Sequence, residues 1–178
     1  MAKASDEVRE FLRQPVATAA IERLIEAAIQ APSAVNKQPW MFTVIRNRPL
    51  LDQISVQSKK YLVESGDAPH DFHAILSDPG FHILYHAPAL IVISTIKDDA
   101  WSREDAAVAA QNLMLTAYAN GLGTCWIGFA ERWLQTNEGR KAIGVSEYYR
   151  PVAPIIVGHP KGGAAEVPRN PPTIHWID

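Results

Sequence analysis

The densest group of residues able to do chemistry lies between Ala31 and Trp40, which read A-P-S-A-V-N-K-Q-P-W. Two prolines there surround the hydroxyl of Ser33 and the carboxamides of Asn36 and Gln38. A carboxamide both donates and accepts hydrogen bonds, so this pair can recognise a ring edge on which acceptors and an N–H alternate. The same side chains can instead hydrogen-bond to the backbone of their own loop. Loop chemistry by itself leaves both interpretations open.

Other reactive side chains are weaker candidates. His82 and His86 lie four residues apart, the spacing of two metal ligands on one helical face, but no third ligand is suitably spaced. We therefore predict no metal site. Cys125 lies in an apolar, β-like stretch, so we expect an inert, buried thiol. No Walker loop, G-x-G-x-x-G, G-x-S-x-G or C-x-x-C occurs, which counts against nucleoside triphosphatases, Rossmann proteins and serine hydrolases.

The composition is that of one ordinary globular domain spanning residues 1–178, with 47% hydrophobic and 20% charged residues. A net charge of −2 gives no bulk attraction to nucleic acid or to anionic membranes. The longest apolar stretch, Ala87–Ile96, is too short to span a bilayer, and Met1–Glu10 does not resemble a signal peptide. A single cysteine fits a reducing compartment. We therefore expect a cytoplasmic protein that binds neither nucleic acid nor membranes.

Helices are predicted where apolar residues recur at helical spacing between start and stop signals, such as Thr18 as a cap and Gly121 as a C-terminal turn. The expected helices are Val8–Leu12, Thr18–Ala31, Pro49–Tyr61 and Ser102–Asn120, with partial helix over Glu131–Ile143. Ser102 and Asp105 have the spacing of a capping box at the start of the longest helix.

Strands are predicted where β-branched and aromatic residues form short runs. The expected strands are Trp40–Ile45, Ala89–Ile96, Gly123–Phe129, Val152–Val157 and Thr173–Ile177. Between the second predicted strand and the helix before it, Glu64–Pro79 shows no clear period. We expect residues 59–85 to form a lid or an insertion on the surface.

Two features favour a homodimer. The helix predicted at Ser102–Asn120 is apolar on nearly every side, and such a helix must be buried all round. In so small a protein, a second copy of the chain can most readily bury the remaining apolar side of this helix. The C-terminal segment 159–178 is rich in Gly and Pro and closes with an apolar, β-like stretch. We expect an arm that reaches over a partner and adds a strand to it.

Three blocks of the sequence resemble the nitroreductase family. Ala31–Trp40 matches the family motif A-P-S-x-x-N-x-Q-P-W at every fixed position. Asp105–Gly128 is similar to the family's D-x-A-x-A-x-Q-N-L-x-L-x-A helix with the G-L-G and W-x-G that follow it. Pro154–Pro160 resembles the I-x-x-x-G-Y-P strand. The blocks occur in the family's order, which makes the resemblance much more specific than any one block.

The resemblance implies an α+β fold, the nitroreductase-like fold, with a mainly antiparallel sheet wrapped by helices and a dimer with exchanged C-terminal arms. It also implies FMN as the cofactor, held between the two subunits. Carried over by position, Pro32, Ser33 and Asn36 would contact the flavin from one subunit.

The remaining cofactor contacts implied by the resemblance come from two other segments. The backbone of Ile127 and Gly128 would approach the flavin near its N5 atom, and a glycine there leaves room for a close backbone N–H. Arg169 matches the family's basic residue beyond the G-Y-P strand and would bind the phosphate.

One departure from the family lies near the N-terminus. The family usually has R-R-S-x-R-x-F there, and the aligned residues 5–11 keep only Arg9 and Phe11. Asp6 and Glu7 place negative charge where a phosphate is expected, and like charges repel strongly in a partly dry site. Either other basic residues bind the phosphate, or FMN binds weakly, or the cofactor differs. The basic candidates are Arg9, Arg13, Lys161 and Arg169.

The activity implied by the resemblance is an NAD(P)H oxidoreductase that passes hydride through FMN to nitroaromatic, quinone or similar electron-poor acceptors. A flavin carries this chemistry itself, so we name no catalytic acid or base. Two alternatives stay open. One is a flavin enzyme specialised for one metabolite, with residues 59–85 setting its specificity. The other is a non-catalytic homodimer with a weakened FMN site. The sequence does not distinguish NADH from NADPH as the donor.

Overall fold

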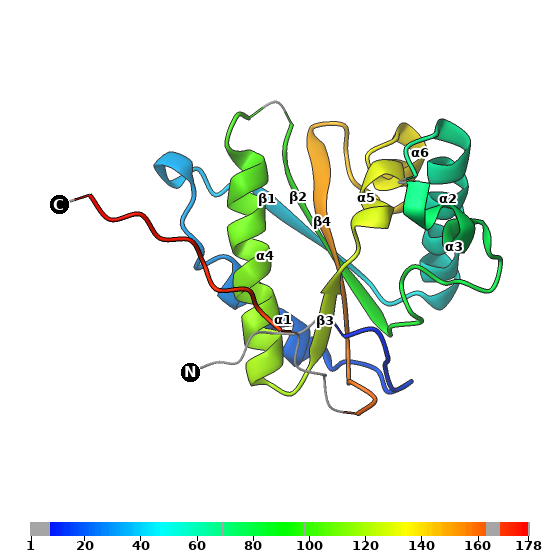
Figure 1. Cartoon of the computed structure of the whole chain (residues 1–178), viewed down its shortest axis with the longest axis horizontal. Coiled ribbons are helices and arrows are strands. Elements are labelled where there is room, and N and C mark those ends of the chain that lie inside the picture. The colour runs from blue at the N-terminus through cyan, green and yellow to red at the C-terminus, as the bar shows by residue number, and fades with distance from the viewer. Residues whose placement is uncertain (1–7, 69, 98, 163–167, 178) are drawn as a thin grey trace.

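The structure is a computed structural model that describes residues 8–68, 70–97, 99–162 and 168–177. Its centre is a sheet with the strand order β1-β2-β4-β3, in which every neighbouring pair is antiparallel (Figure 1). The strands are β1 (Trp40–Ile45), β2 (Ala89–Ile96), β3 (Gly123–Trp126) and β4 (Tyr149–Gly158). The two longest strands, β2 and β4, lie in the middle and are almost entirely buried. Helices cover both faces of the sheet, which explains why these strands read as continuous apolar runs.

Helices α1 (Thr18–Ala28) and α4 (Ser102–Ala119) cover one face of the sheet (Figure 1). Their buried residues Leu24 and Leu113 join a core that includes Ile91 and Ile93 of β2. Alternate residues of the same strand, Leu90 and Val92, point into the core on the opposite face. This alternation follows from the two-residue period of a strand.

The other face is covered by α2 (Arg48–Ser65), α3 (His73–Ser77), α5 (Gly128–Leu134) and α6 (Asn137–Ala142) (Figure 1). Leu51 and Ile54 of α2 and Leu134 of α5 pack here against the sheet, and all three are essentially inaccessible. Two single 3-10 turns, Ala34–Asn36 and His70–Phe72, complete the regular structure of the described residues. None of the helices in the described ranges is both long and apolar enough to cross a membrane.

The predicted fold class is confirmed, and so are most of its elements. Strands β1 and β2 have the predicted bounds, and β4 extends the predicted Val152–Val157 by a few residues at its start. Helix α1 begins at Thr18 as predicted, although Ala17 holds the N-cap position and no side chain caps the helix. Helix α2 begins one residue before Pro49 and continues four residues beyond the predicted end, to Ser65. Gly121 has a φ of 71° and makes the predicted left-handed turn after α4.

The predicted helix over Val8–Leu12 is wrong. The chain there lies against the sheet: the Val8 amide donates to the Thr124 carbonyl at 2.9 Å, and Phe11 forms an isolated antiparallel bridge with Pro160. Two strand glycines make room for these apolar side chains. A Cβ added at Gly123 would lie 2.7 Å from the Val8 side chain, and one at Gly158 would lie 2.6 Å from the Phe11 ring. The helical spacing of these apolar residues therefore does not indicate a helix here, because Val8 and Phe11 pack over glycines of the sheet.

The predicted capping box of α4 is also wrong. Trp101 holds the N-cap position, and the Ser102 hydroxyl donates to the Asp99 carbonyl at 3.1 Å. The Asp105 carboxylate accepts instead from the backbone N–H of Ala34, 3.0 Å away. A contact between residues far apart in the sequence has replaced the local one.

Two predicted strands differ in the structure. The strand predicted at Gly123–Phe129 ends at Trp126, since α5 begins at Gly128. Thr173–Ile177 is not a strand in the single chain. A strand needs a neighbour to satisfy its N–H and carbonyl groups, and the described residues provide none at this position. The segment predicted as a lid, residues 59–85, begins as the end of α2 and contains the short helix α3.

Candidate functional site

One cavity of about 550 Å³ brings together three of the seven predicted site residues: Arg9, Ile127 and Gly128. It opens between the turn that joins β3 to α5 and the segment predicted as a lid. Strand β3 also contributes Cys125 and Trp126, and α5 adds Phe129 and Arg132. From the lid segment come Leu62, Asp67, Phe72, Ile83 and Tyr85. A mainly apolar cavity of this size, with a few charged groups, is typical of a small-molecule site.

The β3–α5 turn is rigid, and its glycine faces open space. The Ile127 amide donates to the Pro154 carbonyl at 2.8 Å, and the Ile127 side chain is buried, which anchors the turn on β4. A Cβ added at Gly128 would meet no protein atom within 4 Å. The backbone at Gly128 is therefore exposed to whatever fills the cavity, with no side chain in between.

Arg9 is positioned by the extended segment around it. Val8 hydrogen-bonds to β3 on one side, and Phe11 packs against Gly158 on the other. The Arg9 guanidinium carbon lies 5.9 Å from the centre of the Tyr85 ring, within the range of a cation–π contact. Arg9 thus brings a positive charge to the wall of the cavity. Asp67 is the one carboxylate among the described residues that line it.

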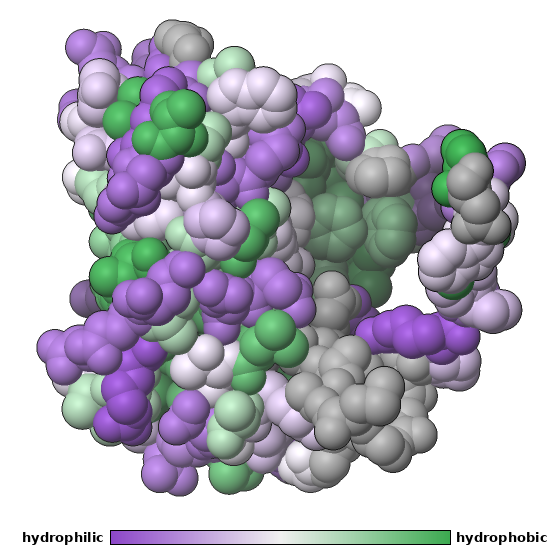
Figure 2. Space-filling view, turned by 90° about the vertical axis from the view of Figure 1, so that its left-hand side faces the viewer, coloured by the Kyte–Doolittle hydropathy of each residue, from purple (hydrophilic) through white to green (hydrophobic). Residues whose placement is uncertain are grey.

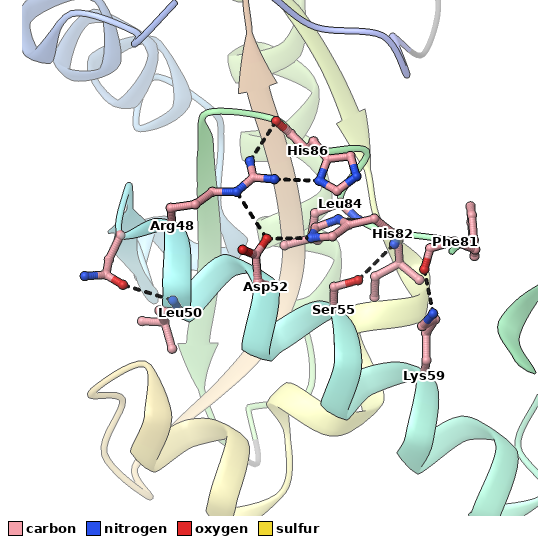
Figure 3. Close-up of polar contacts among 11 residues, drawn as sticks. Arg48, Leu50, Asp52, Ser55, Lys59, Phe81, His82, Leu84 and His86 are labelled. Atoms are coloured by element: carbon pink, nitrogen blue, oxygen red, sulfur yellow. Dashed lines mark hydrogen bonds and ion pairs between the residues drawn. The ribbon is translucent and has the colours of Figure 1, made fainter. Parts of the chain in front are cut away.

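The face of α2 that looks toward the cavity wall holds residues 78–86 in place. Figure 3 shows Asp52, Ser55 and Lys59 pointing at this segment from successive turns of the helix. The Ser55 hydroxyl accepts from the Ile83 amide at 3.1 Å, and the ammonium of Lys59 donates to the Phe81 carbonyl at 2.5 Å. These contacts fix a segment that is neither helix nor strand.

The same network holds a strained turn. Tyr85 and His86 have φ values of 48° and 54°, a left-handed backbone that non-glycine residues rarely adopt. Arg48 donates to the His86 carbonyl at 3.0 Å and to its Nδ1 at 2.5 Å, and so stabilises the turn. The result is that Tyr85 lines the cavity while His86 lies outside it. Such strain is concentrated at functional sites in many proteins.

His82 and His86 lie side by side, although not on a helix, and a third group joins them that sequence reasoning missed. The Asp52 carboxylate and the two imidazoles offer ligand atoms that all lie within 4.8 Å of one another. Arg48 already binds two of these groups, since its Nε lies 3.1 Å from Asp52 and its Nη2 hydrogen-bonds to His86. The polar residues of α2 recur at helical spacing (48, 52, 55, 59), and this periodicity is the signal that could have revealed the network.

His82 carries an uncharged ring in this network. Its Nδ1 accepts from the Leu84 amide at 3.2 Å, so its Nε2 carries the proton and donates to Asp52 at 3.0 Å. Burial lowers the pKa of His82 below its ordinary value of 6.5, and the hydrogen bond to Asp52 opposes this effect only in part.

The motif loop lies away from the cavity, next to α4 and on the opposite side of the molecule from α2 (Figure 1). Pro32, Ser33 and Asn36 do not line the cavity in the single chain. The Ser33 hydroxyl accepts from the Gln38 amide at 2.9 Å, and the Gln38 carboxamide donates to Asn36 at 3.1 Å. Within one chain, these side chains therefore stabilise their own loop.

Two contacts attach the motif loop to the start of α4. Asp105 accepts from the Ala34 amide, and Lys37 forms an ion pair of 2.6 Å with Asp99. The hydrogen bond from Lys37 lowers the pKa of Asp99 below its ordinary value. The loop is also strained, because Val35, which is 87% exposed, has a φ of 47°. A β-branched residue in this conformation is a genuine outlier.

Arg169, the seventh predicted site residue, lies in the C-terminal arm and does not line the cavity. Residues 168–177 of the arm are all exposed. In Figure 1 the arm passes α4 and leaves the body of the molecule. The single chain thus brings Arg9, Ile127 and Gly128 together and leaves Pro32, Ser33, Asn36 and Arg169 apart from them.

Arg132, Phe72 and Tyr85 line the cavity but were not predicted. Arg132 lies four residues after Gly128 on α5, so the helical spacing would have placed it on the same face. Nothing in the local sequence pattern marks Phe72 or Tyr85, because the tertiary fold alone brings the lid segment to the turn after β3.

Comparison with known proteins identifies relatives of this fold. The model of the nitroreductase family matches residues 6–159. A protein of Methanothermobacter thermautotrophicus with the name "Putative NADH dehydrogenase/NAD(P)H nitroreductase" is 27% identical over 157 residues, which cover 86% of this chain and 72% of that protein.

Two solved structures have the same fold. An FMN-bound nitroreductase of Bacteroides fragilis has a TM-score of 0.88 at 24% identity, covering 99% of this chain and 96% of its own. An FMN-bound nitroreductase of Desulfitobacterium hafniense has a TM-score of 0.85 at 22% identity, covering 99% and 95%. The family model spans most of the sequence, including the motif loop, the long helix α4 and the strand β4. The chain belongs to the nitroreductase family.

Proposed function

We propose that this protein is an FMN-dependent oxidoreductase that takes hydride from NAD(P)H and passes it to a small electron-poor acceptor. The observation that carries the proposal is the β3–α5 turn, where Gly128 lines the cavity and no atom from another segment of the chain lies within 4 Å of its Cβ position. Relatives of the same fold carry FMN in their crystal structures. We also infer that the protein works in the cytoplasm, where a lone cysteine stays reduced.

The residues of the cavity fit a flavin. The open backbone at Gly128 can approach a flat ring, the apolar side chains of Ile127 and Phe129 can exclude water, and Arg9 can attract the phosphate. Bound FMN would supply the carrier for two electrons. The protein would then need only to bind, orient and desolvate its ligands. Asp6 and Glu7, where the family has basic residues, lie outside the described residues.

The motif loop would complete the site from a second copy of the chain. Pro32, Ser33 and Asn36 cannot reach the cavity of their own chain without a large rearrangement, because α4 and the sheet lie between them (Figure 1). In a homodimer, the loop of one subunit would meet the cavity of the other. The side chain of Val35, almost fully exposed in the single chain, would be covered by that contact. Arg169 would reach a phosphate in the same way, from an exchanged arm.

The lid segment would select the acceptor. Phe72 lies edge-on to Phe129 with ring centres 5.4 Å apart, and such a pair suits flat aromatic molecules. Nitroaromatics and quinones have this shape. A single aromatic metabolite is the alternative substrate, because Asp67 and Arg132 could bind its charged groups.

An absorption spectrum tests the proposal directly. The purified protein, or the protein mixed with FMN, is expected to show flavin bands that NADH or NADPH bleaches and that a nitroaromatic or quinone restores. Bands that bleach but recover only with one particular compound would indicate the specialised alternative. A protein without flavin bands, indifferent to added FMN, would overturn the proposal and favour the non-catalytic alternative.

A size series at Gly128 tests the site. Gly128 is the first residue of α5 and an added Cβ there meets no atom of another segment, so alanine or leucine should preserve the fold. FMN affinity is expected to fall with side-chain size, by about tenfold or more for Gly128→Leu, because the side chain would occupy the cavity. Unchanged FMN affinity in Gly128→Leu would place the flavin elsewhere.

A further inference from the structure

A second cavity, of about 660 Å³, lies beside the first and is lined by three arginines. Arg13, Arg46 and Arg48 surround it together with His86, and Phe11, Pro15 and Pro88 form its apolar walls. Two stretches of chain separate the cavities. In the N-terminal stretch, Arg9 lines the first cavity and Phe11 lines the second. In the strained turn, Tyr85 lines the first cavity and His86 lines the second. Among the described residues that line this second cavity, none is a carboxylate.

The positive charge at the second cavity is only partly balanced. In the described ranges, no carboxylate lies within ion-pair distance of Arg13 or Arg46. Arg46 donates to the hydroxyl of Thr18 at 3.0 Å, at the very start of α1. That helix has no side-chain cap and no acidic residue in its first turn. The positive end of the helix dipole therefore adds to the charge of the arginines.

Arg48 is the rigid member of the three. Its contacts to Asp52, to the His86 carbonyl and to His86 Nδ1 use three of the five N–H groups of a guanidinium (Figure 3). Asp52 is itself held by the proton of His82. The Arg48 guanidinium is thus fixed in orientation and keeps N–H groups for a ligand, which lowers the entropy lost on binding.

We propose that this second cavity binds the phosphate of an organic phosphomonoester. A phosphomonoester carries a charge of about −1.5 to −2 and accepts bidentate hydrogen bonds, which guanidinium groups match. The apolar walls of Phe11, Pro15 and Pro88 suit the organic part of such a ligand rather than free phosphate. Two sources have this chemistry: the 2′-phosphate of a nicotinamide dinucleotide and the 5′-phosphate of a flavin. Binding of a phosphomonoester at this second cavity does not require the flavin chemistry proposed above.

Two pairs of probes that differ by one phosphate test the proposal: NADP⁺ against NAD⁺, and FMN against riboflavin. Binding to the purified full chain is measured by calorimetry at constant ionic strength. We expect one phosphorylated probe to bind more tightly than its counterpart. Arg13→Gln and Arg46→Gln should each reduce that advantage about tenfold or more, since each removes a charge-assisted contact. The exposed Arg150, which hydrogen-bonds only to Gln135 among the described residues, provides the control Arg150→Gln.

The outcomes separate the two sources. An advantage of NADP⁺ over NAD⁺ that depends on Arg46 assigns the site to the dinucleotide and makes NADPH the preferred donor. An advantage of FMN over riboflavin that depends on Arg46 assigns it to the flavin. The proposal is overturned if neither pair shows a phosphate-dependent advantage, or if the advantage is the same in Arg46→Gln as in Arg150→Gln. A failure to bind FMN together with tight binding of NADP⁺ would refute the flavin proposal alone.

Discussion

At the scale of single residues, the contacts of His82 depend on pH. The rings of His82 and His86 lie 4.2 Å apart, and each accepts a hydrogen bond at Nδ1, from the Leu84 amide and from Arg48 respectively. A protonated imidazole has no acceptor nitrogen, so the contact between His82 and the Leu84 amide requires an uncharged His82 ring. Acid should therefore weaken the network that supports the turn between the two cavities.

The stability of the protein should fall as the pH falls through the range in which His82 is protonated. Its pKa is lowered by burial, so below the ordinary value of 6.5 the unfolded chain binds a proton that the folded chain still excludes. Stability should then decrease with decreasing pH until the folded-state pKa is passed, and level off below it. Urea denaturation at a series of pH values from about 8 to 5 measures this slope.

His82→Gln should show a smaller loss of stability over the same range, because its folded and unfolded states no longer differ in proton uptake at this position. His73→Gln is the matched control, since His73 is exposed and lies outside the network. If His82→Gln retains the full slope of the unsubstituted protein, His82 is not the group responsible.

At the scale of elements, the motif loop is held by contacts that its own sequence does not reveal. Positive φ values at Val35, Asn36 and Gln38 make the loop costly to form, by roughly 1–3 kcal/mol for each outlier. Asp105, at the start of α4, offsets this cost through its hydrogen bond to Ala34. The second carboxylate oxygen of Asp105 is buried and has no partner among the described residues.

Asp105→Ala should loosen the motif loop. The substitution removes the acceptor of the Ala34 N–H, and the expected loss of stability is about 1–3 kcal/mol, measured by denaturation. Asp105→Asn keeps an acceptor oxygen and should lose less. Glu104→Ala is the control, because Glu104 is an exposed acid of the same helical turn. Hydrogen exchange at residues 34–38 should accelerate in Asp105→Ala only; equal exchange in all three variants would show that Asp105 does not anchor the loop.

At the scale of the whole molecule, apolar side chains are gathered on the side that carries α4 and the C-terminal arm. Val108, Leu115 and Tyr118 of α4 are each about 40% exposed, and Trp176 in the arm is 79% exposed. Figure 2, which views this side, shows hydrophobic surface within a hollow of the molecule. Large apolar groups exposed together usually mark a protein–protein interface. We regard this side as the surface that a second copy covers.

Leu115→Arg should therefore weaken the dimer. A charge placed in an apolar interface is expected to raise the dissociation constant about thirtyfold or more, which light scattering coupled to size exclusion would detect as a shift toward the monomer mass. Val56→Arg is the matched control, because Val56 is equally apolar and 56% exposed but lies on α2, on the opposite side of the sheet. In Leu115→Arg, but not in Val56→Arg, FMN binding should weaken together with dimerisation. A protein that is a monomer before substitution would refute the two-copy site.

Much of the fold was readable from the sequence, because its signals are local. The β-branched run of β2 and the alternation in β1 predicted both strands to the residue, and the spacing of Ile21, Leu24 and Ala28 predicted α1. Of the residues that family resemblance indicated, Ile127 and Gly128 line the cavity, whereas those of the motif loop do not line it in the single chain. The cavity itself could not be predicted, since Arg9, Tyr85 and Gly128 meet only after the sheet has formed.

The sequence by itself determined most of the secondary structure, the fold class and the family, because periodicity and short motifs act between residues a few positions apart. Only the tertiary structure decided that Val8 and Phe11 fill spaces above strand glycines, that Asp52 joins the two histidines, and that three arginines surround one cavity. Each of these depends on contacts between residues distant in the chain. Such contacts depend on the volume and charge of side chains that folding brings together. They therefore produce no periodic pattern in the sequence.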